Sequence, residues 1–148
     1  IKLLYLFSKI NSKINQGEQV LFCGPSNKSV DNVARWTKEL EKGPKIVRLY
    51  GRSIEALDYP IPGAEFTSKR SMRYLKTDEN LHDITVHHLI RKIGKPFAEQ
   101  IREFDRRFHN EKYIPHFEEV SKYMSLISKA TVEELQQYEV IMCTTGVA

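Results

Sequence analysis

Cysteine is scarce in this sequence. The 148 residues include two cysteines, Cys23 and Cys143, too few for the disulfide framework of a small secreted domain. This usage fits a reducing compartment, so we expect an intracellular location, in the nucleus or the cytoplasm. Long apolar runs are also lacking. None reaches the roughly 20 residues that a membrane-spanning helix needs, and the short run at residues 3–7 is not followed by a signal-peptide cleavage site. We therefore expect no membrane partner.

Recognisable catalytic and metal-binding groupings are lacking as well. The five histidines have no paired cysteine ligands beside them, and the adjacent His87 and His88 should point to different sides of a helix. We therefore predict no metal site. No Ser-His-Asp or Cys-His arrangement can be assigned, so we predict no catalytic residue in this chain. The composition is 41% hydrophobic and 28% charged with a net charge of +4, which permits a polyanionic partner without requiring one.

Apolar segments of strand and helix length alternate along the chain. Strand-like runs are present at residues 19–23, 45–50 and 138–143, an apolar stripe at helical spacing covers residues 1–15, and a second helix is predicted at 28–42. Strand–helix–strand order with short breaks predicts a parallel sheet and hence an α/β fold. We expect three residues on the inner face of the second helix: Val30, Val33 and Leu40.

The middle of the chain has a different pattern. Residues 59–81 predict a long loop, and residues 83–138 predict helices throughout, with a break at 113–115 that gives an antiparallel helical hairpin. Thr131 and Glu134 have the spacing of a capping box, which predicts one more short helix. The sheet is thus predicted to be interrupted by a helical insertion. The two apolar stripes of the hairpin are Phe97, Ile101, Phe104 and Phe108, and Phe117, Val120, Met124 and Ile127.

Residues 23–29, CGPSNKS, are similar to a phosphate-binding P-loop but depart from its pattern. The P-loop requires G-x-x-x-x-G-K-[ST], whereas here Asn27 precedes Lys28 and Pro25 has no N–H group to donate. We predict a strand-to-helix turn in which Ser26 or Asn27 caps the helix. The turn is either an ordinary N-cap or a contact for a phosphate of a nucleic-acid backbone. A degenerate nucleotide kinase that uses Lys28 is a further alternative.

Other residues could share a ligand with this turn. The run Cys143-Thr144-Thr145-Gly146 follows the last predicted strand, and its hydroxyl groups would lie at the same sheet edge if the strands are parallel.

Basic residues form a second candidate, either a solvated helix face or a track for nucleic acid. The residues of this possible basic track are Lys69, Arg70, Arg73, Arg102 and Arg106.

Three segments together resemble a known family. Residues 19–34, QVLFCGPSNKSVDNVA, resemble motif Ia of superfamily 1B helicases, in the branch typified by the RNA helicase of nonsense-mediated decay. Residues 45–60, KIVRLYGRSIEALDYP, are similar to the strand and turn that follow motif Ia, and residues 139–148, EVIMCTTGVA, are similar to motif Ic. These segments, together with HHLIRK at residues 87–92 and FAEQIREFDRRF at residues 97–108, are most similar to helicase with zinc finger domain 2 and its relatives.

The resemblance implies a partial RecA-like parallel sheet, that is, a fragment of a P-loop NTPase fold. It implies part of the first RecA-like domain at residues 1–58, a loop at 59–81, an accessory helical subdomain at 82–137 and a strand with motif Ic at 138–148. Single-stranded RNA or DNA would be the partner, with RNA favoured, and the helical insertion could bind a protein. The residues that match the nucleic-acid-binding motifs are Pro25, Ser26, Asn27 and Thr144.

The resemblance also implies what this chain would not do. ATP and Mg²⁺ would be cofactors of a parent ATP-dependent helicase, whose P-loop would precede Ile1 and whose Asp-Glu box would follow Ala148. We therefore expect an internal fragment that binds neither cofactor and does not hydrolyse ATP by itself. The alternative is a non-enzymatic protein-interaction module built on a helicase-like scaffold.

Overall fold

A parallel sheet, with three strands among the described residues, organises the chain. The computed structural model describes residues 2–63, 77–110 and 112–148. The strands are β1 (Val20–Gly24), β2 (Ile46–Arg48) and β3 (Val140–Thr144), in the spatial order β1-β3-β2. The predicted parallel sheet and α/β class are confirmed. The strand that comes last in the sequence is thus the central one.

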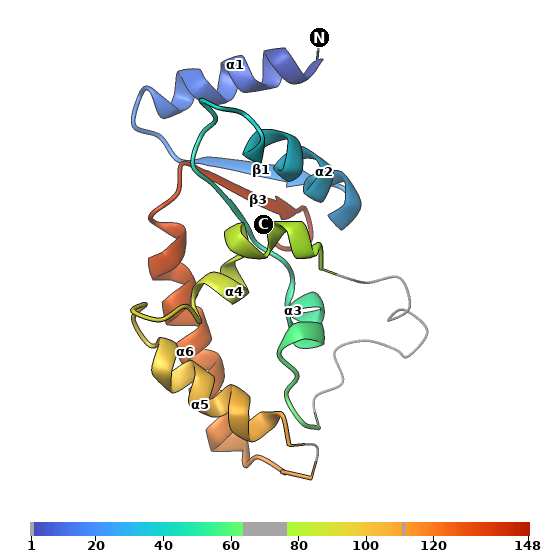
Figure 1. Cartoon of the computed structure of the whole chain (residues 1–148), viewed down its shortest axis with the longest axis vertical. Helices are drawn as coiled ribbons and strands as arrows, with labels where there is room; N and C mark the ends of the chain where they lie inside the picture. Colours follow the sequence, from blue (N-terminus) through green and yellow to red (C-terminus); the bar gives the residue numbers. More distant parts are fainter. Residues whose placement is uncertain (1, 64–76, 111) are drawn as a thin grey trace.

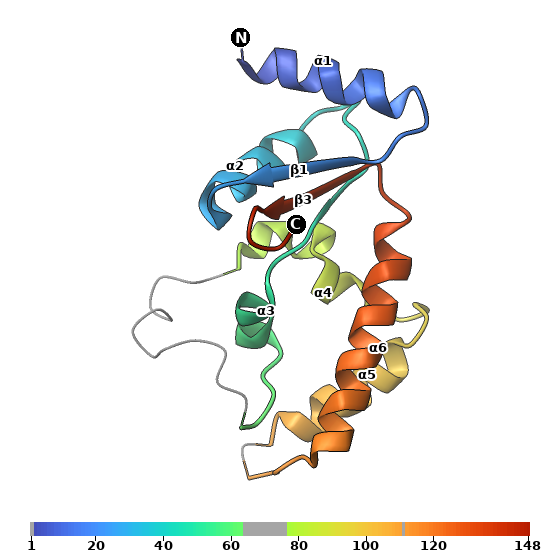
Figure 2. The same ribbon diagram turned by 180° about the vertical axis from the view of Figure 1, so that it is seen from behind.

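Helices cover both faces of this sheet. α1 (Lys2–Ile14) and α2 (Asn27–Lys38) lie on one side, and the α-helices described between β2 and β3 lie on the other (Figures 1 and 2). Successive residues of a strand point to opposite faces. Accordingly, Ile46 packs with Val30 and Met142 under α2, whereas Val47 belongs to the core of the other layer.

The second layer consists of the helices between β2 and β3. They are α3 (Arg52–Asp58), α4 (Val86–Leu89), α5 (Ala98–Phe108) and α6 (Phe117–Leu135), whereas the 3₁₀ helix η2 (Glu79–Ile84), before α4, packs into the core under α2. α5 and α6 run in opposite directions, as predicted for a hairpin (Figure 1). Ile101, Phe104 and Phe108 are buried against Tyr123 and Ile127. In the described residues, no helix is long and apolar enough to span a bilayer.

Three local predictions are wrong. α2 ends at Lys38, so Leu40 lies beyond its inner face and is 45% exposed. Residues 83–138 are not helical throughout, because turns separate α4, α5 and α6. Thr131 and Glu134 do not open a new helix, because α6 continues to Leu135. Glu134 is instead buried, where it pairs with Lys95 at 2.7 Å.

Candidate functional site

The carboxyl ends of β1 and β3 lie side by side. Gly24 is in register with Thr144 across the parallel pair, and the N–H group of Thr145 donates to the carbonyl of Gly24 at 3.1 Å. The two motifs predicted to share an edge therefore do share one. In an open α/β sheet, ligands bind beyond the carboxyl ends of the strands, so this edge is the candidate site.

Gly24 lets the helix start immediately after β1. A Cβ atom at this position would lie 2.6 Å from Cγ2 of Val30, inside α2. Only glycine permits so close an approach of helix to strand. As a result, the N-terminus of α2 lies next to the carboxyl end of β1.

Ser26 is the N-cap of α2. Its Oγ accepts a hydrogen bond from the backbone N–H of Ser29 at 3.2 Å, and Oγ of Ser29 accepts one from the N–H of Ser26 at 3.2 Å. The N-cap prediction is thereby confirmed for Ser26. The N–H groups of Asn27 and Lys28, in the first turn, have no acceptor within the helix. They lie at the positive end of the helix dipole, which attracts anions.

Arg48 binds residues of α2 at the candidate site through hydrogen bonds. Its side chain is fully buried in β2, where Nε donates to Oδ1 of Asp31 at 2.7 Å and Nη2 donates to Oδ1 of Asn27 at 2.8 Å. The guanidinium also stacks on Tyr50, 3.8 Å from the ring centroid. Tyr50 donates its hydroxyl to Asp31 at 2.9 Å, and burial together with the Asp31 charge raises the pKa of this phenol.

This network fixes the orientation of the Asn27 amide. Arg48 can only donate hydrogen bonds, so the group of Asn27 that faces it must be the carbonyl oxygen. The NH₂ group of Asn27 is therefore the part left for other partners. Asn27 is half-buried, next to the exposed Ser26 and Pro25, so it contributes a preoriented donor to the sheet edge.

Arg48, Asp31 and Tyr50 are not among the site residues predicted from the sequence. Two signals could have revealed them. An arginine stands in the middle of the apolar run KIVRLY, and Asp31 follows Asn27 by four residues, which places both on one face of a helix. A buried arginine needs a carboxylate partner, and Asp31 is close enough along the fold to supply it.

The possible basic track is not assembled at this edge. Lys69, Arg70 and Arg73 lie outside the described residues. Arg102 and Arg106 are exposed on α5, which packs on α6 at the end of the molecule away from the sheet (Figure 1). Arg106 there pairs with Glu103 at 2.6 Å. The structure thus separates these two arginines from Asn27 and Thr144, and their role in binding stays a prediction.

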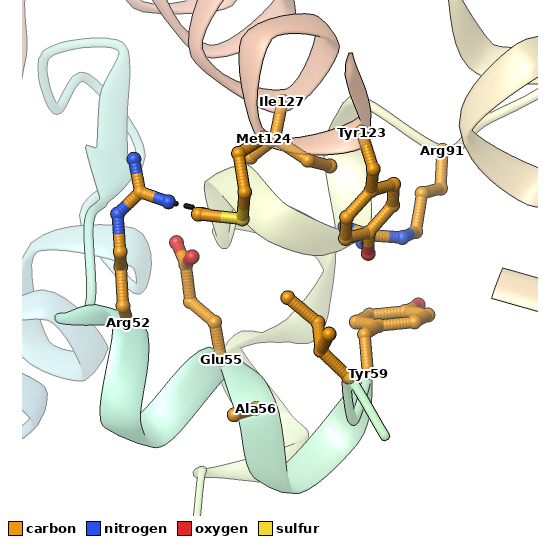
Figure 3. Close-up of a pocket in the computed structure, with 9 residues that line it drawn as sticks. Arg52, Glu55, Ala56, Tyr59, Arg91, Tyr123, Met124 and Ile127 are labelled. Atoms are coloured by element: carbon orange, nitrogen blue, oxygen red, sulfur yellow. Dashed lines mark hydrogen bonds between the residues drawn. The ribbon is translucent and has the colours of Figure 1, made fainter. Parts of the chain in front are cut away.

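A small pocket lies between α3 and α6 (Figure 3). Arg91 stacks on Tyr59, 3.6 Å from the ring centroid, and donates to Asp105 at 2.7 Å and to Tyr123 at 2.8 Å. Burial raises the pKa of the Glu55 carboxyl, which points into the pocket. The cavity volume of about 30 Å³ has room for one or two water molecules and not for a nucleotide.

The histidine prediction needs a correction. His87 and His88 do not point to different sides, because Nε2 of His87 lies 2.8 Å and Nε2 of His88 3.2 Å from Oδ2 of Asp58. α4 is only one turn long, and both of its histidine rings reach the carboxylate at the end of α3. Burial and the neighbouring imidazoles of His87 and His82 lower the pKa of His88 to about 4, so this ring is neutral at physiological pH.

The fold and the candidate site together indicate a class of protein. The chain is an α/β protein with a small parallel sheet, compatible with part of a RecA-like domain. Comparison with known proteins adds two relatives, both named 3'-5' exoribonuclease HELZ2. The chain is 35% identical to the mouse (Mus musculus) protein over 134 residues and 34% identical to the human (Homo sapiens) protein over 135 residues, in each case 89% of this chain.

The matched stretches are short parts of long proteins. The chain spans 4% of the mouse relative and 5% of the human relative. HELZ2 is a helicase with zinc finger domain 2, so the resemblance predicted from motifs Ia and Ic is confirmed. No protein-family model matches the chain.

Proposed function

We propose that this chain forms part of the single-stranded nucleic-acid-binding face of a superfamily 1 helicase core. Pro25, Ser26, Asn27 and Thr144 contact the sugar–phosphate backbone of the bound strand. The observation that carries the proposal is the pairing of Gly24 with Thr144, which brings both helicase-like motifs to one sheet edge. The N-terminus of α2 adds free N–H groups, and Arg48 holds the Asn27 amide with its NH₂ group available.

RNA is the proposed strand. The relatives are named exoribonucleases, and that name supports RNA rather than DNA. In this proposal the parent protein is an ATP-dependent helicase that uses ATP and Mg²⁺, and α5 and α6 belong to a helical subdomain inserted into its RecA-like domain. The chain itself contributes binding and positioning, because none of its residues match the P-loop or the Asp-Glu box.

Asn27→Asp is the most selective test of the proposed site. The substitution keeps the oxygen that accepts from Arg48 but replaces the NH₂ donor with a second, negatively charged oxygen. Losing a charge-assisted contact and adding repulsion should weaken binding of a fluorescein-labelled single-stranded RNA by about tenfold, or ~1.4 kcal/mol. Fluorescence anisotropy at two salt concentrations measures the effect.

Asn11→Asp is the matched control, with the same change of charge on an exposed position of α1. It should bind RNA as the wild type does. Far-UV circular dichroism checks that both variants fold. If folded Asn27→Asp binds as tightly as Asn11→Asp, the strand edge is not the RNA site. Ser26→Ala with Thr144→Ala should also weaken binding, since each change removes a backbone contact.

A protein-interaction module is the second candidate. Ile114, shortly before α6, and Phe117, the first residue of α6, are each 86% exposed, so they offer two neighbouring apolar side chains to a partner. In this alternative the sheet is a scaffold and the hairpin recruits a protein. Replacing both residues with serine should then abolish partner binding while RNA affinity stays unchanged, and Asn27→Asp should change neither.

A further inference from the structure

A cluster of ligand-type side chains lies outside the proposed nucleic-acid face. Asp58 ends α3, and His87 and His88 lie in α4. One ligand atom from each of these three residues lies within 4.8 Å of the other two. Histidine nitrogen and carboxylate oxygen are the atoms that Zn²⁺ takes most often after cysteine sulfur.

The two distances from histidine nitrogen to carboxylate oxygen are close to those in a tetrahedral metal site. Bonds of about 2.0–2.1 Å in a tetrahedron place neighbouring ligand atoms ~3.3 Å apart. Here the two Nε2 atoms lie 2.8 Å and 3.2 Å from the same carboxylate oxygen. An ion therefore requires each nitrogen–oxygen distance to lengthen by up to about half an ångström, while the ligand atoms of the two rings, which lie within 4.8 Å of each other, settle at ~3.3 Å.

Supporting partners surround the three side chains. The hydroxyl of Tyr59 lies 3.0 Å from Nδ1 of His88, and the hydroxyl of Thr77 donates to both oxygens of Asp58, at 3.0 Å and 3.3 Å. Metal-bound histidines usually hold a hydrogen-bond partner on the second ring nitrogen, and metal-bound carboxylates are hydrogen-bonded in turn. The Tyr59 contact supplies the first for His88, and the Thr77 contacts supply the second for Asp58.

His87 is not satisfied by the hydrogen bonds of the cluster alone. The residue is 1% exposed, and its Nδ1 has no hydrogen-bond partner among the described residues. When Nε2 binds an ion, this nitrogen carries the ring proton, and a buried water molecule is the partner expected for it. The other two groups are reachable from solvent, because the side chains of Asp58 and His88 are 23% and 18% exposed.

We propose that Asp58, His87 and His88 bind a zinc ion, or a first-row divalent cation of the same preference. Zn²⁺ takes four ligands, and the fourth is a water molecule or the ring of His82. That ring lies 4.0 Å from the ring of His88 between centroids, and its Nε2 is 3.3 Å from the Thr77 hydroxyl. On binding, the Nε2 protons of both ligating histidines move to Nδ1, where His88 then donates to Tyr59.

The ion would tie α3 to α4. Thr85, directly before α4, also pairs with Arg48 of β2 through an isolated parallel bridge. A metal at Asp58 therefore reinforces the attachment of the helical layer to the sheet, next to the residue that orients Asn27. Its role would be structural, since bound metal adds its binding free energy to the folded state.

Co²⁺ is the probe for this site, added to the whole chain after treatment with a chelator. A tetrahedral site should give visible absorption that saturates at one equivalent, and Zn²⁺ should remove it. Asp58→Asn, His87→Gln and His88→Asn should each weaken Co²⁺ binding at least about tenfold. His109→Asn, on an exposed histidine at the end of α5, should leave it unchanged. Mg²⁺ should give no competition, because it prefers oxygen ligands.

Two further measurements keep the test decisive. Zn²⁺ should shift the ring ¹⁵N resonances of His87 and His88 in the wild type but not those of His109 and His116. This NMR measurement uses the wild-type protein and so does not depend on the folding of any variant. Cys23→Ser should retain the visible band, which excludes binding through a thiolate. A folded wild type without a saturable Co²⁺ band or a ring ¹⁵N shift would overturn the proposal, as would binding that survives all three ligand substitutions.

Discussion

Removing the Arg48 guanidinium should destabilise the protein severely. Arg48→Met keeps an unbranched apolar side chain but leaves the Asp31 carboxylate without its ion pair. Asp31 is 7% exposed, so water cannot replace the lost partner without opening the core. The Asn27 amide oxygen and the Leu49 carbonyl also lose the donors that reach them at 2.8 Å and 2.6 Å. The substitution therefore leaves one buried charge and two acceptors unsatisfied.

The expected cost follows from this uncompensated charge. Breaking a buried ion pair by deleting one partner costs about 3–5 kcal/mol, against a typical total stability of about 5–15 kcal/mol for a domain. At roughly 2–4 °C per kcal/mol for a chain of this size, the melting temperature should fall by about 10 °C. Urea unfolding followed by far-UV circular dichroism gives the free energy directly.

A matched control and a double variant make the test specific. Arg102→Met removes an exposed arginine and should change the free energy of unfolding by no more than ~0.5 kcal/mol. Asp31→Leu combined with Arg48→Met replaces the whole ion pair with apolar groups and should be less destabilising than the sum of the two single changes. A loss below ~1 kcal/mol for Arg48→Met, or full additivity in the double variant, would refute the reasoning.

Three further outcomes are expected. Because burial raises the pKa of Glu55 above its ordinary 4.5 in the folded protein, its ionisation opposes folding. Glu55→Gln should therefore stabilise the fold at pH 7 and lose that advantage below pH ~4.5, as pH-dependent urea titrations would show. Iodoacetamide should alkylate the exposed Cys23 long before the buried Cys143, because burial and the neighbouring Cys23 raise the pKa of the Cys143 thiol to about 11. Peptide mass spectrometry measures the two alkylation rates, and equal rates would contradict this expectation. Gly24→Ala should cost about 1–3 kcal/mol in thermal unfolding, through its 2.6 Å clash with Val30, and an unchanged melting temperature would contradict it.

The sheet and its helices could be predicted because their signals are local. The strand at Val140–Thr144 and the helix at Ala98–Phe108 follow directly from apolar periodicity, and both are confirmed within a few residues. The end of α2 was placed too late because Leu40 continues the apolar spacing of the helix, although Gly43 and Pro44 follow closely. A pattern of residue types does not show where the packing contacts of a helix stop.

The site was only half predictable for a related reason. The shared edge of Ser26 and Thr144 could be predicted because each follows a strand end, and parallel strands end at one edge. Arg48 and Asp31 leave weaker signals, an arginine within an apolar run and an aspartate four residues after Asn27, and their pairing depends on how α2 packs on the sheet. The same holds for Asp58 with His87 and His88, which are about thirty residues apart in the sequence and meet because the fold brings α4 to the end of α3.

The central position of β3 has a consequence for the order of folding. β1 and β2 each pair with β3 and share no ladder with each other. During synthesis, the first two strands must wait until residue 144 has left the ribosome before either finds its partner. Such pairings across more than ninety residues form slowly. Until then β1 and β2 are unpaired, and unpaired strand edges favour aggregation of a partly folded chain.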